Sequence, residues 1–98
     1  MSAAPVDPAA EAVGQLQALA GDLTGRGFDA QVIQDGARAR VSVAHRDVSQ
    51  LSENVYIAPT GDGRWWFWWS WGDRIARITA VETAAFKIAY VLTPHSHG

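Results

Sequence analysis

Apolar positions along the chain are densest in the segment 65–71, which reads WWFWWSW and holds all five tryptophans of the protein. A β-strand directs alternate side chains to opposite faces of its sheet. The alternation divides the segment into one set for each face: Trp65, Phe67, Trp69 and Trp71 for the first, and Trp66 and Trp68 for the second. We expect the first set to fill a core, which leaves the second as aromatic surface on the opposite face.

The segment near Asp7–Gly25 has apolar residues at helical spacing and predicts an amphipathic helix. Asp7 can cap this helix, and Pro8 suits its first position because a missing N–H costs nothing there. The apolar stripe consists of Ala9, Ala12, Val13, Leu16, Leu19, Ala20 and Leu23. Such a stripe can bind a partner, but its periodicity favours a core-facing side.

A second amphipathic helix is predicted near Thr79–Thr93. The residues 79–82, TAVE, have the Ser/Thr-x-x-Glu form of a capping box, and Pro94 stops the helix. Its apolar stripe consists of Val81, Ala84, Ala85, Ile88 and Leu92. We expect this stripe to pack on the same core as the first.

Between the helices, the segments Phe28–Gln34 and Ala37–His45 alternate in polarity and predict a β-hairpin. Asp35-Gly36 lies between them, and this dipeptide is the strongest short hairpin signal. A turn on these two residues would pair Phe28 with Val43, so that apolar residues meet one another. The other face is then polar and basic, with Asp29, Gln31, Ile33, Arg38, Arg40 and Ser42.

The segment Glu53–Pro59 predicts a third strand, which a turn connects to the tryptophan strand. A three-residue loop, Gly61–Gly63, would pair Ile57 with Phe67 and leave Arg64 on the outer face. A two-residue loop would exchange the two faces of the whole strand. We therefore predict the three-residue loop, because it suits the polarity of Arg64.

A fifth strand is predicted at Arg74–Ile78, after a tight turn at Gly72-Asp73. Ile75 and Arg77 would then lie on the outer face, with Arg77 opposite Trp68. Without this strand, the tryptophan segment would form a sheet edge with a high tendency to aggregate.

These elements predict an α+β fold, a two-layer sandwich with the element order α-β-β-β-β(-β)-α. The sheet is antiparallel with four or five strands, and the N- and C-terminal helices lie on one face. Residues 7–94 form a single domain, residues 1–6 a flexible tail and residues 95–98 a polar tail. No predicted element is left to cover the outer face of the sheet.

Composition places the chain in a broad class without assigning a function. A chain of 98 residues suits one domain, and its net charge of −2 gives no reason to expect binding to nucleic acid or an anionic membrane. It has no cysteine, which fits a reducing compartment. The start of the chain lacks a secretory signal, and no apolar run is long enough for a membrane span. We expect a cytoplasmic protein.

No motif of a familiar hydrolytic or redox enzyme is present, so we expect no catalytic residues, cofactor or metal. His45 and Asp47 lie close enough in sequence to form an acid–base pair, although polar loops produce such pairs without any role. His95 and His97 offer two metal ligands, but a site needs three or four in a fixed frame.

The surplus aromatic surface makes protein association the expected function, with a homodimer or an adaptor as its form. The predicted binding residues are Trp66 and Trp68, with Tyr56, Arg38, Arg40, Arg64 and Arg77 around them. The two tryptophans represent about 400 Å² of surface, half of what each partner buries in a standard interface. The alternatives on this face are a small ligand, a carbohydrate or single-stranded nucleic acid, or a covering loop such as Arg46–Ser52 or the N-terminal tail.

The segment 63–75, GRWWFWWSWGDRI, resembles a signature of small uncharacterised actinobacterial proteins. In that family a similar tryptophan-rich strand precedes an alanine-rich closing helix. The resemblance spans Leu16–Leu92, and the tryptophan segment is its specific part. It implies an actinobacterial, cytoplasmic protein and no known activity, and no catalytic residue can be transferred from it. The arginine- and alanine-rich composition agrees with such an origin.

Overall fold

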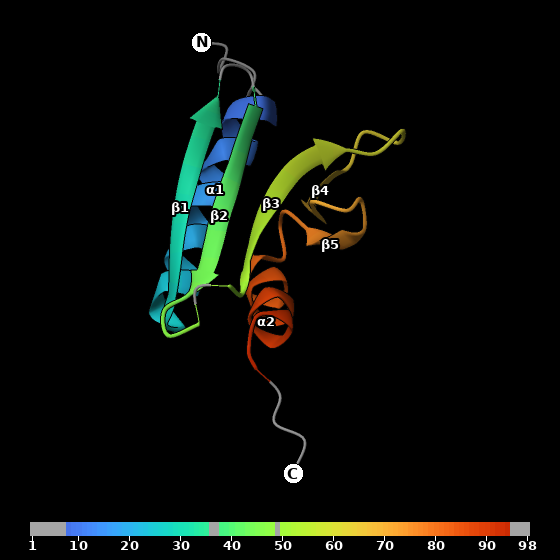
Figure 1. Ribbon diagram of the computed structural model, residues 1–98. Helices are drawn as coiled ribbons and strands as arrows, with labels where there is room; N and C mark the ends of the chain where they lie inside the picture. The colour runs from blue at the N-terminus through green and yellow to red at the C-terminus, as the bar shows by residue number, and fades with distance from the viewer. Residues whose placement is uncertain (1–7, 36–37, 49, 95–98) are drawn as a thin grey trace.

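The computed structural model describes residues 8–35, 38–48 and 50–94. Two helices enclose five strands along the chain: α1 (Pro8–Gly25), β1 (Phe28–Asp35), β2 (Arg38–His45), β3 (Ser52–Pro59), β4 (Trp65–Trp69), β5 (Arg74–Arg77) and α2 (Val81–Val91). The strands form one antiparallel sheet in the order β1-β2-β3-β4-β5 (Figure 1). The predicted α+β fold is confirmed, and the sheet has the fifth strand.

The predicted tails, residues 1–6 and 95–98, lie outside the described residues, as does the predicted cap Asp7. Within the described part of the chain, neither helix is long and apolar enough to cross a membrane.

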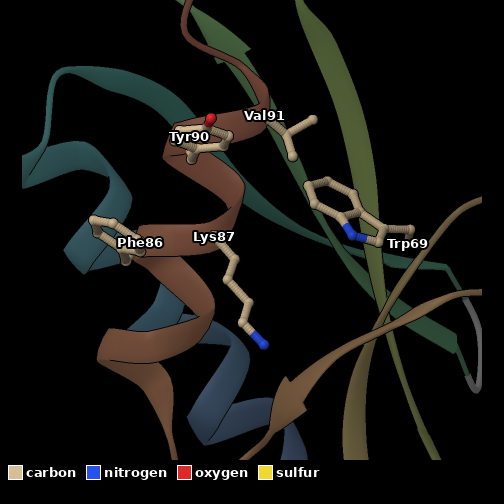
Figure 2. A pocket seen from close by; sticks show the side chains of 5 residues that line it. All are labelled: Trp69, Phe86, Lys87, Tyr90 and Val91. Carbon is tan, nitrogen blue, oxygen red and sulfur yellow. The ribbon is translucent and has the colours of Figure 1, made fainter.

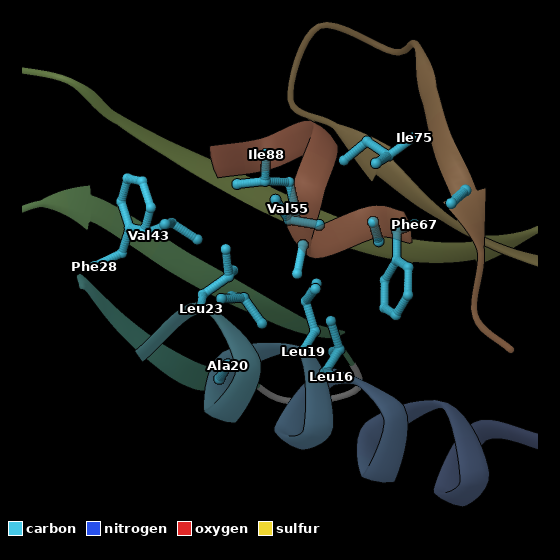
Figure 3. Close-up of a cluster of buried hydrophobic side chains, with 14 of the residues drawn as sticks. Leu16, Leu19, Ala20, Leu23, Phe28, Val43, Val55, Phe67, Ile75 and Ile88 are labelled. Atoms are coloured by element: carbon cyan, nitrogen blue, oxygen red, sulfur yellow. The ribbon is translucent and has the colours of Figure 1, made fainter. Parts of the chain in front are cut away.

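One hydrophobic core lies between the sheet and both helices (Figure 3). The α1 side chains Leu16, Leu19 and Leu23 are fully buried, and Ile88 of α2 joins them from the second helix. The sheet contributes the inward positions predicted from alternation, with Val41, Val43, Val55, Phe67 and Trp69 all buried. Because both stripes face this cluster, the two helices lie on the same side of the sheet.

The β1–β2 register differs from the predicted one by two residues. Phe28 pairs with His45, and Asp35 pairs with Arg38, so Asp35 belongs to the ladder and not to the turn. A shift of two residues keeps every side chain on its face, so the hydrophobic pattern could not detect the error. The observed register lengthens the ladder, and the rings of Phe28 and His45 meet edge to face, with centroids 5.7 Å apart.

The β3–β4 hairpin has the predicted register. Val55 pairs with Trp69 and Ile57 with Phe67. The N–H of Thr60 donates to the carbonyl of Arg64 at 2.8 Å, which closes the three-residue loop Gly61–Gly63.

A carboxylate organises this loop. The Thr60 hydroxyl and the backbone N–H of Arg64 both donate to Oδ1 of Asp62, the second at 3.1 Å. These hydrogen bonds, the Thr60 one first, lower the pKa of Asp62 below its ordinary value of about 3.9. Because the folded-state pKa lies below the unfolded one, the loop is stabilised above about pH 4. That stabilisation is lost as the pH falls through the lowered pKa.

A pH titration of the backbone amide signals of Gly63 and Arg64 by NMR is expected to show a transition with its midpoint below about pH 3.9. The Asp62→Asn variant removes the ionisable group and should abolish this transition. A wild-type midpoint at or above the ordinary value would contradict the hydrogen-bonded loop.

The β4–β5 hairpin differs from the prediction in both turn and register. The N–H of Trp69 donates to the carbonyl of Asp73 at 2.8 Å, which closes a three-residue loop, Ser70–Gly72, in place of the predicted turn on Gly72-Asp73. A bulge next to Phe67 and Trp68 then leaves Ile75 as the extra residue of β5. Ile75 was predicted on the outer face, and this is wrong, because its side chain is only 3% exposed.

The bulge also changes which arginine faces which tryptophan. Arg77 lies opposite Trp66, not Trp68 as predicted, and Arg74 takes the place opposite Trp68. Both helices hold β5 and the turn after it through side chains. Lys87 Nζ donates to the carbonyl of Ile75 at 2.9 Å, and Gln15 Nε2 donates to that of Ile78 at 2.8 Å.

The predicted capping box at the start of α2 is wrong. The N-cap residue is Ala80, and no side chain caps the helix. Thr79 instead lies in the turn that the N–H of Ala80 closes on the carbonyl of Arg77, at 2.9 Å. The apolar stripe of α2 is nevertheless as predicted, with Ala84, Ala85 and Ile88 buried.

Candidate association surfaces

The face of the sheet opposite the core, called the outer sheet face from here on, carries a row of aromatic and cationic side chains. The registers place Arg40, Tyr56, Trp68 and Arg74 opposite one another in turn, across β2, β3, β4 and β5. All of them belong to the face that the two helices leave uncovered. The row therefore crosses most of the width of the sheet.

Trp66 lies beside this row and is covered by two arginines. The guanidinium carbon of Arg74 lies 4.7 Å from the Trp66 ring centroid, and that of Arg77 lies 5.9 Å away. Both distances are within the range of cation–π attraction. The indole nitrogen of Trp66 is buried, and no described residue accepts a hydrogen bond from it.

Trp68 is also half-buried, and its indole N–H donates to the carbonyl of Ala58 at 3.0 Å. Because Trp66 and Trp68 are both half-buried, they offer less than the roughly 400 Å² estimated for two complete tryptophan side chains. The apolar area of the outer sheet face is therefore smaller than the sequence suggested, and Arg74 and Arg77 lie over one of its two tryptophan rings.

Of the predicted arginines, Arg38, Arg40 and Arg77 lie at outward positions of their strands and Arg64 immediately precedes β4, while the structure adds Arg74. Arg38 and Arg64 are exposed, whereas Arg40 and Arg77 are half-buried. Arg74 was not among the predicted site residues, because the sequence gives no sign of the bulge that turns it toward Trp66. Two of these cations have polar partners: Arg40 Nε donates to Asn54 Oδ1 at 3.3 Å, and Arg64 Nε lies 3.6 Å from Asp62 Oδ2. Although the chain has a net charge of −2, its outer sheet face is basic.

The largest exposed apolar side chains lie elsewhere, on α2 and in the turn after β4. Phe86 and Tyr90 are each 63% exposed, Trp71 is 53% exposed and Val91 is 46% exposed. A groove of about 380 Å³ runs beside α2 and is lined by Trp69, Phe86, Lys87, Tyr90 and Val91. Figure 2 shows Lys87 and Val91 on the side of α2 next to Trp69, with Phe86 and Tyr90 on the neighbouring side.

Trp71 was predicted to face the core, and this is wrong. The strand ends at Trp69, so alternation no longer governs the turn that follows. The Trp71 ring stacks on that of Trp69, with centroids 4.7 Å apart and planes 9° from parallel. Its indole N–H donates to Asp73 Oδ2 at 2.9 Å. The stack extends the aromatic surface from the groove to the β4–β5 turn.

Sequence reasoning did not find this second surface, although a signal for it exists. Phe86 and Tyr90 are four residues apart, so they lie next to each other on one side of a helix. They fall outside the core stripe of Ala84, Ala85 and Ile88. A second apolar stripe beside the core stripe indicates that the helix has more apolar surface than it can bury against the core of its domain.

His45, which the sequence offered as part of an acid–base pair, takes part in a turn. His45 Nδ1 accepts the backbone N–H groups of Asp47 and Val48, both at 3.1 Å, so the ring nitrogen stabilises the turn after β2. Within the described ranges, no group of three or more His, Cys, Asp or Glu side chains could hold a metal ion. His95 and His97 lie outside those ranges.

No family model matches the chain, and neither the curated proteins nor the solved structures include a match. The resemblance to an actinobacterial tryptophan-rich family therefore stays a prediction.

Proposed function

We propose that the chain is a small, non-enzymatic protein-association module that binds its partner on the outer sheet face. The observation that carries this proposal is the row of paired residues Arg40, Tyr56, Trp68 and Arg74, with Trp66 and Arg77 beside it. Tryptophan, tyrosine and arginine are the residue types that dominate the binding energy of protein interfaces. Trp68 is held by its hydrogen bond to Ala58 and Arg40 by its hydrogen bond to Asn54, so these two side chains lose less entropy when a partner binds.

The stacked arginines indicate the chemistry of the partner. A guanidinium group that lies over a ring keeps its planar N–H donors available for a carboxylate. Arg74 and Arg77 are held in this way over Trp66. Arg38 adds an exposed cation to the same face, and the exposed Arg64 lies immediately before β4. An acidic protein surface with apolar side chains complements such a face, whereas a second copy would bring arginine against arginine.

A cytoplasmic location and an actinobacterial origin are part of the same proposal. The absence of cysteine from the sequence agrees with a reducing compartment. The tryptophan segment 63–75 and the alanine-rich composition support the origin.

The proposal can be tested with a ten-residue peptide rich in aspartate and glutamate that carries one central tyrosine. We expect titration with this peptide to shift NMR signals of Tyr56, Trp66 and Trp68, including the two indole N–H signals. Arg74→Glu should weaken binding at least ~10-fold, because it removes one cation and adds a repulsive charge at the centre of the face.

Arg46→Glu is the matched control, since it makes the same charge change at a residue that pairs with Asp29 at 3.4 Å, away from the tryptophans. If both variants lose the same affinity for the peptide, the net charge of the protein explains the loss, and this would contradict the proposal. A single-stranded oligonucleotide such as (dT)10 that binds more tightly than the peptide would assign the face to nucleic acid instead. A chito-oligosaccharide that does so would assign it to carbohydrate.

A further inference from the structure

We infer that a second copy of this chain docks on the exposed aromatic surface around α2, which makes the protein a homodimer. This surface, called the α2 patch, consists of Trp69, Trp71, Phe86, Lys87, Tyr90 and Val91. The inference concerns the side of the molecule that carries the helices. It does not depend on what binds the outer sheet face.

The size of the α2 patch fits a dimer interface. An aromatic side chain has roughly 150–250 Å² of surface. Trp71, Phe86 and Tyr90 are more than half exposed, so together they present roughly 300–450 Å². This already reaches the largest apolar patch found on a typical monomer, which is about 300–600 Å². A homodimer interface of standard size buries about 800 Å² per copy, of which about two thirds is apolar. Trp71, Phe86, Tyr90 and Val91 therefore supply most of the apolar area that each copy would bury.

The α2 patch combines a ridge with a groove, which is what self-association requires. Phe86 and Tyr90 form the ridge, one helical turn apart, and the groove of about 380 Å³ lies beside them (Figure 2). A two-fold axis places the same surface on both copies, so the ridge of each copy can enter the groove of the other. A partner with only a ridge or only a groove would leave half of this surface unfilled.

The charges of the α2 patch also permit two copies to meet. Lys87 is its one cation, and its ammonium group already donates to the carbonyl of Ile75 at 2.9 Å. The only acidic residue of α2 is Glu82, in the first turn. Two copies therefore meet without the arginine repulsion that would arise on the outer sheet face. Because the helices lie on the other side of the sheet, the dimer would leave both outer sheet faces open to partners.

Sedimentation equilibrium between about 1 and 500 µM tests the inference, a range that covers the weak end of standard-size interfaces. We expect the wild type to be a reversible dimer within this range. Phe86→Glu should raise the dissociation constant at least ~30-fold, because it removes a ring of the ridge and places a carboxylate, which must lose its hydration, in the apolar groove of the other copy. Since Phe86 is 63% exposed, this variant should fold. Gln17→Glu makes the same charge change on the exposed side of α1 and should leave dimerisation unchanged.

Cysteine cross-linking supplies a second measurement, because the chain has no cysteine of its own. With a flexible bismaleimide cross-linker, Phe86→Cys should give a covalent dimer at concentrations where Gln17→Cys stays monomeric. A wild type that remains monomeric up to 500 µM would overturn the inference, and so would a Phe86→Glu variant that dimerises like the wild type. A dimer that Arg74→Glu disrupts and Phe86→Glu does not would place the contact on the outer sheet face, and this would overturn it as well.

Discussion

Replacing Phe67 with alanine is expected to destabilise the protein by about 3–5 kcal/mol, the usual cost of truncating a fully buried phenylalanine. Phe67 is 0% exposed and lies in the middle of β4, where it packs in the core with residues of both helices. The loss consists of the transfer free energy of the ring and the cavity that remains. For a domain of this size, the melting temperature should fall by roughly 15–30 °C.

Urea denaturation followed by far-ultraviolet circular dichroism measures this loss. Trp68→Ala is the matched control, because Trp68 is the next residue on the same strand and has the larger side chain. It is half-buried on the outer sheet face, so its truncation should cost only about 1–2 kcal/mol, including the hydrogen bond to Ala58. A larger loss for Trp68→Ala than for Phe67→Ala would mean that the two faces of β4 are exchanged.

Replacing Ile75 with glutamate should be the second most damaging change, at about 3 kcal/mol or more. The sequence pattern would allow this substitution, since it predicts Ile75 on the outer sheet face. In the structure the side chain is 3% exposed and belongs to the core cluster. A carboxylate there would lose its hydration among the apolar side chains of the core, and burying a charge is costly.

Thr79→Glu is the control for this change, because it introduces the same charge four residues later at an exposed position in the turn before α2. Thermal denaturation of both variants should show a large drop for Ile75→Glu and a shift of only a few degrees for Thr79→Glu. If Ile75→Glu is as stable as Thr79→Glu, the bulge in the β4–β5 hairpin is absent and the tight turn predicted from the sequence is correct.

The two association surfaces suggest how the proposed module would operate. A dimer joined through the α2 patch carries two outer sheet faces, and each can hold an acidic partner. A ligand with two acidic segments would then bind more tightly than either segment alone, provided that it can span both faces. The dimer and the partner-binding face are separate proposals, and the variants at Phe86 and Arg74 test them independently.

Local sequence determined the element types and most of the side-chain faces. The alternation in 65–71 put Phe67 and Trp69 in the core and Trp66 and Trp68 on the other face. The polarity of Arg64 was enough to select the three-residue loop before β4. Helical spacing likewise identified the buried sides of α1 and α2. These features repeat every two or 3.6 residues, so a short stretch of sequence is sufficient to determine them.

The same periodicity predicted which strand residues lie on the outer sheet face, but it did not predict that Arg74 is one of them. Arg74 lies over Trp66 only because a bulge adds one residue to β5. The two-residue shift in the register of β1 and β2 could not be predicted from periodicity either, because it leaves every side chain on the same face of the sheet. Periodicity determines the face on which a side chain lies, whereas register and bulges depend on how neighbouring strands pair.

Only the tertiary structure decided which apolar residues the core has room for. Ile75 is buried because the bulge in β5 turns it to the core side, where Lys87 of α2 and Gln15 of α1 hold β5 and the turn after it. Gln15 is 63 residues from its partner Ile78. Trp71, Phe86 and Tyr90 stay exposed because the core is filled without them. Which apolar side chains a fold leaves uncovered depends on contacts between distant elements, and these form only when the whole chain has folded.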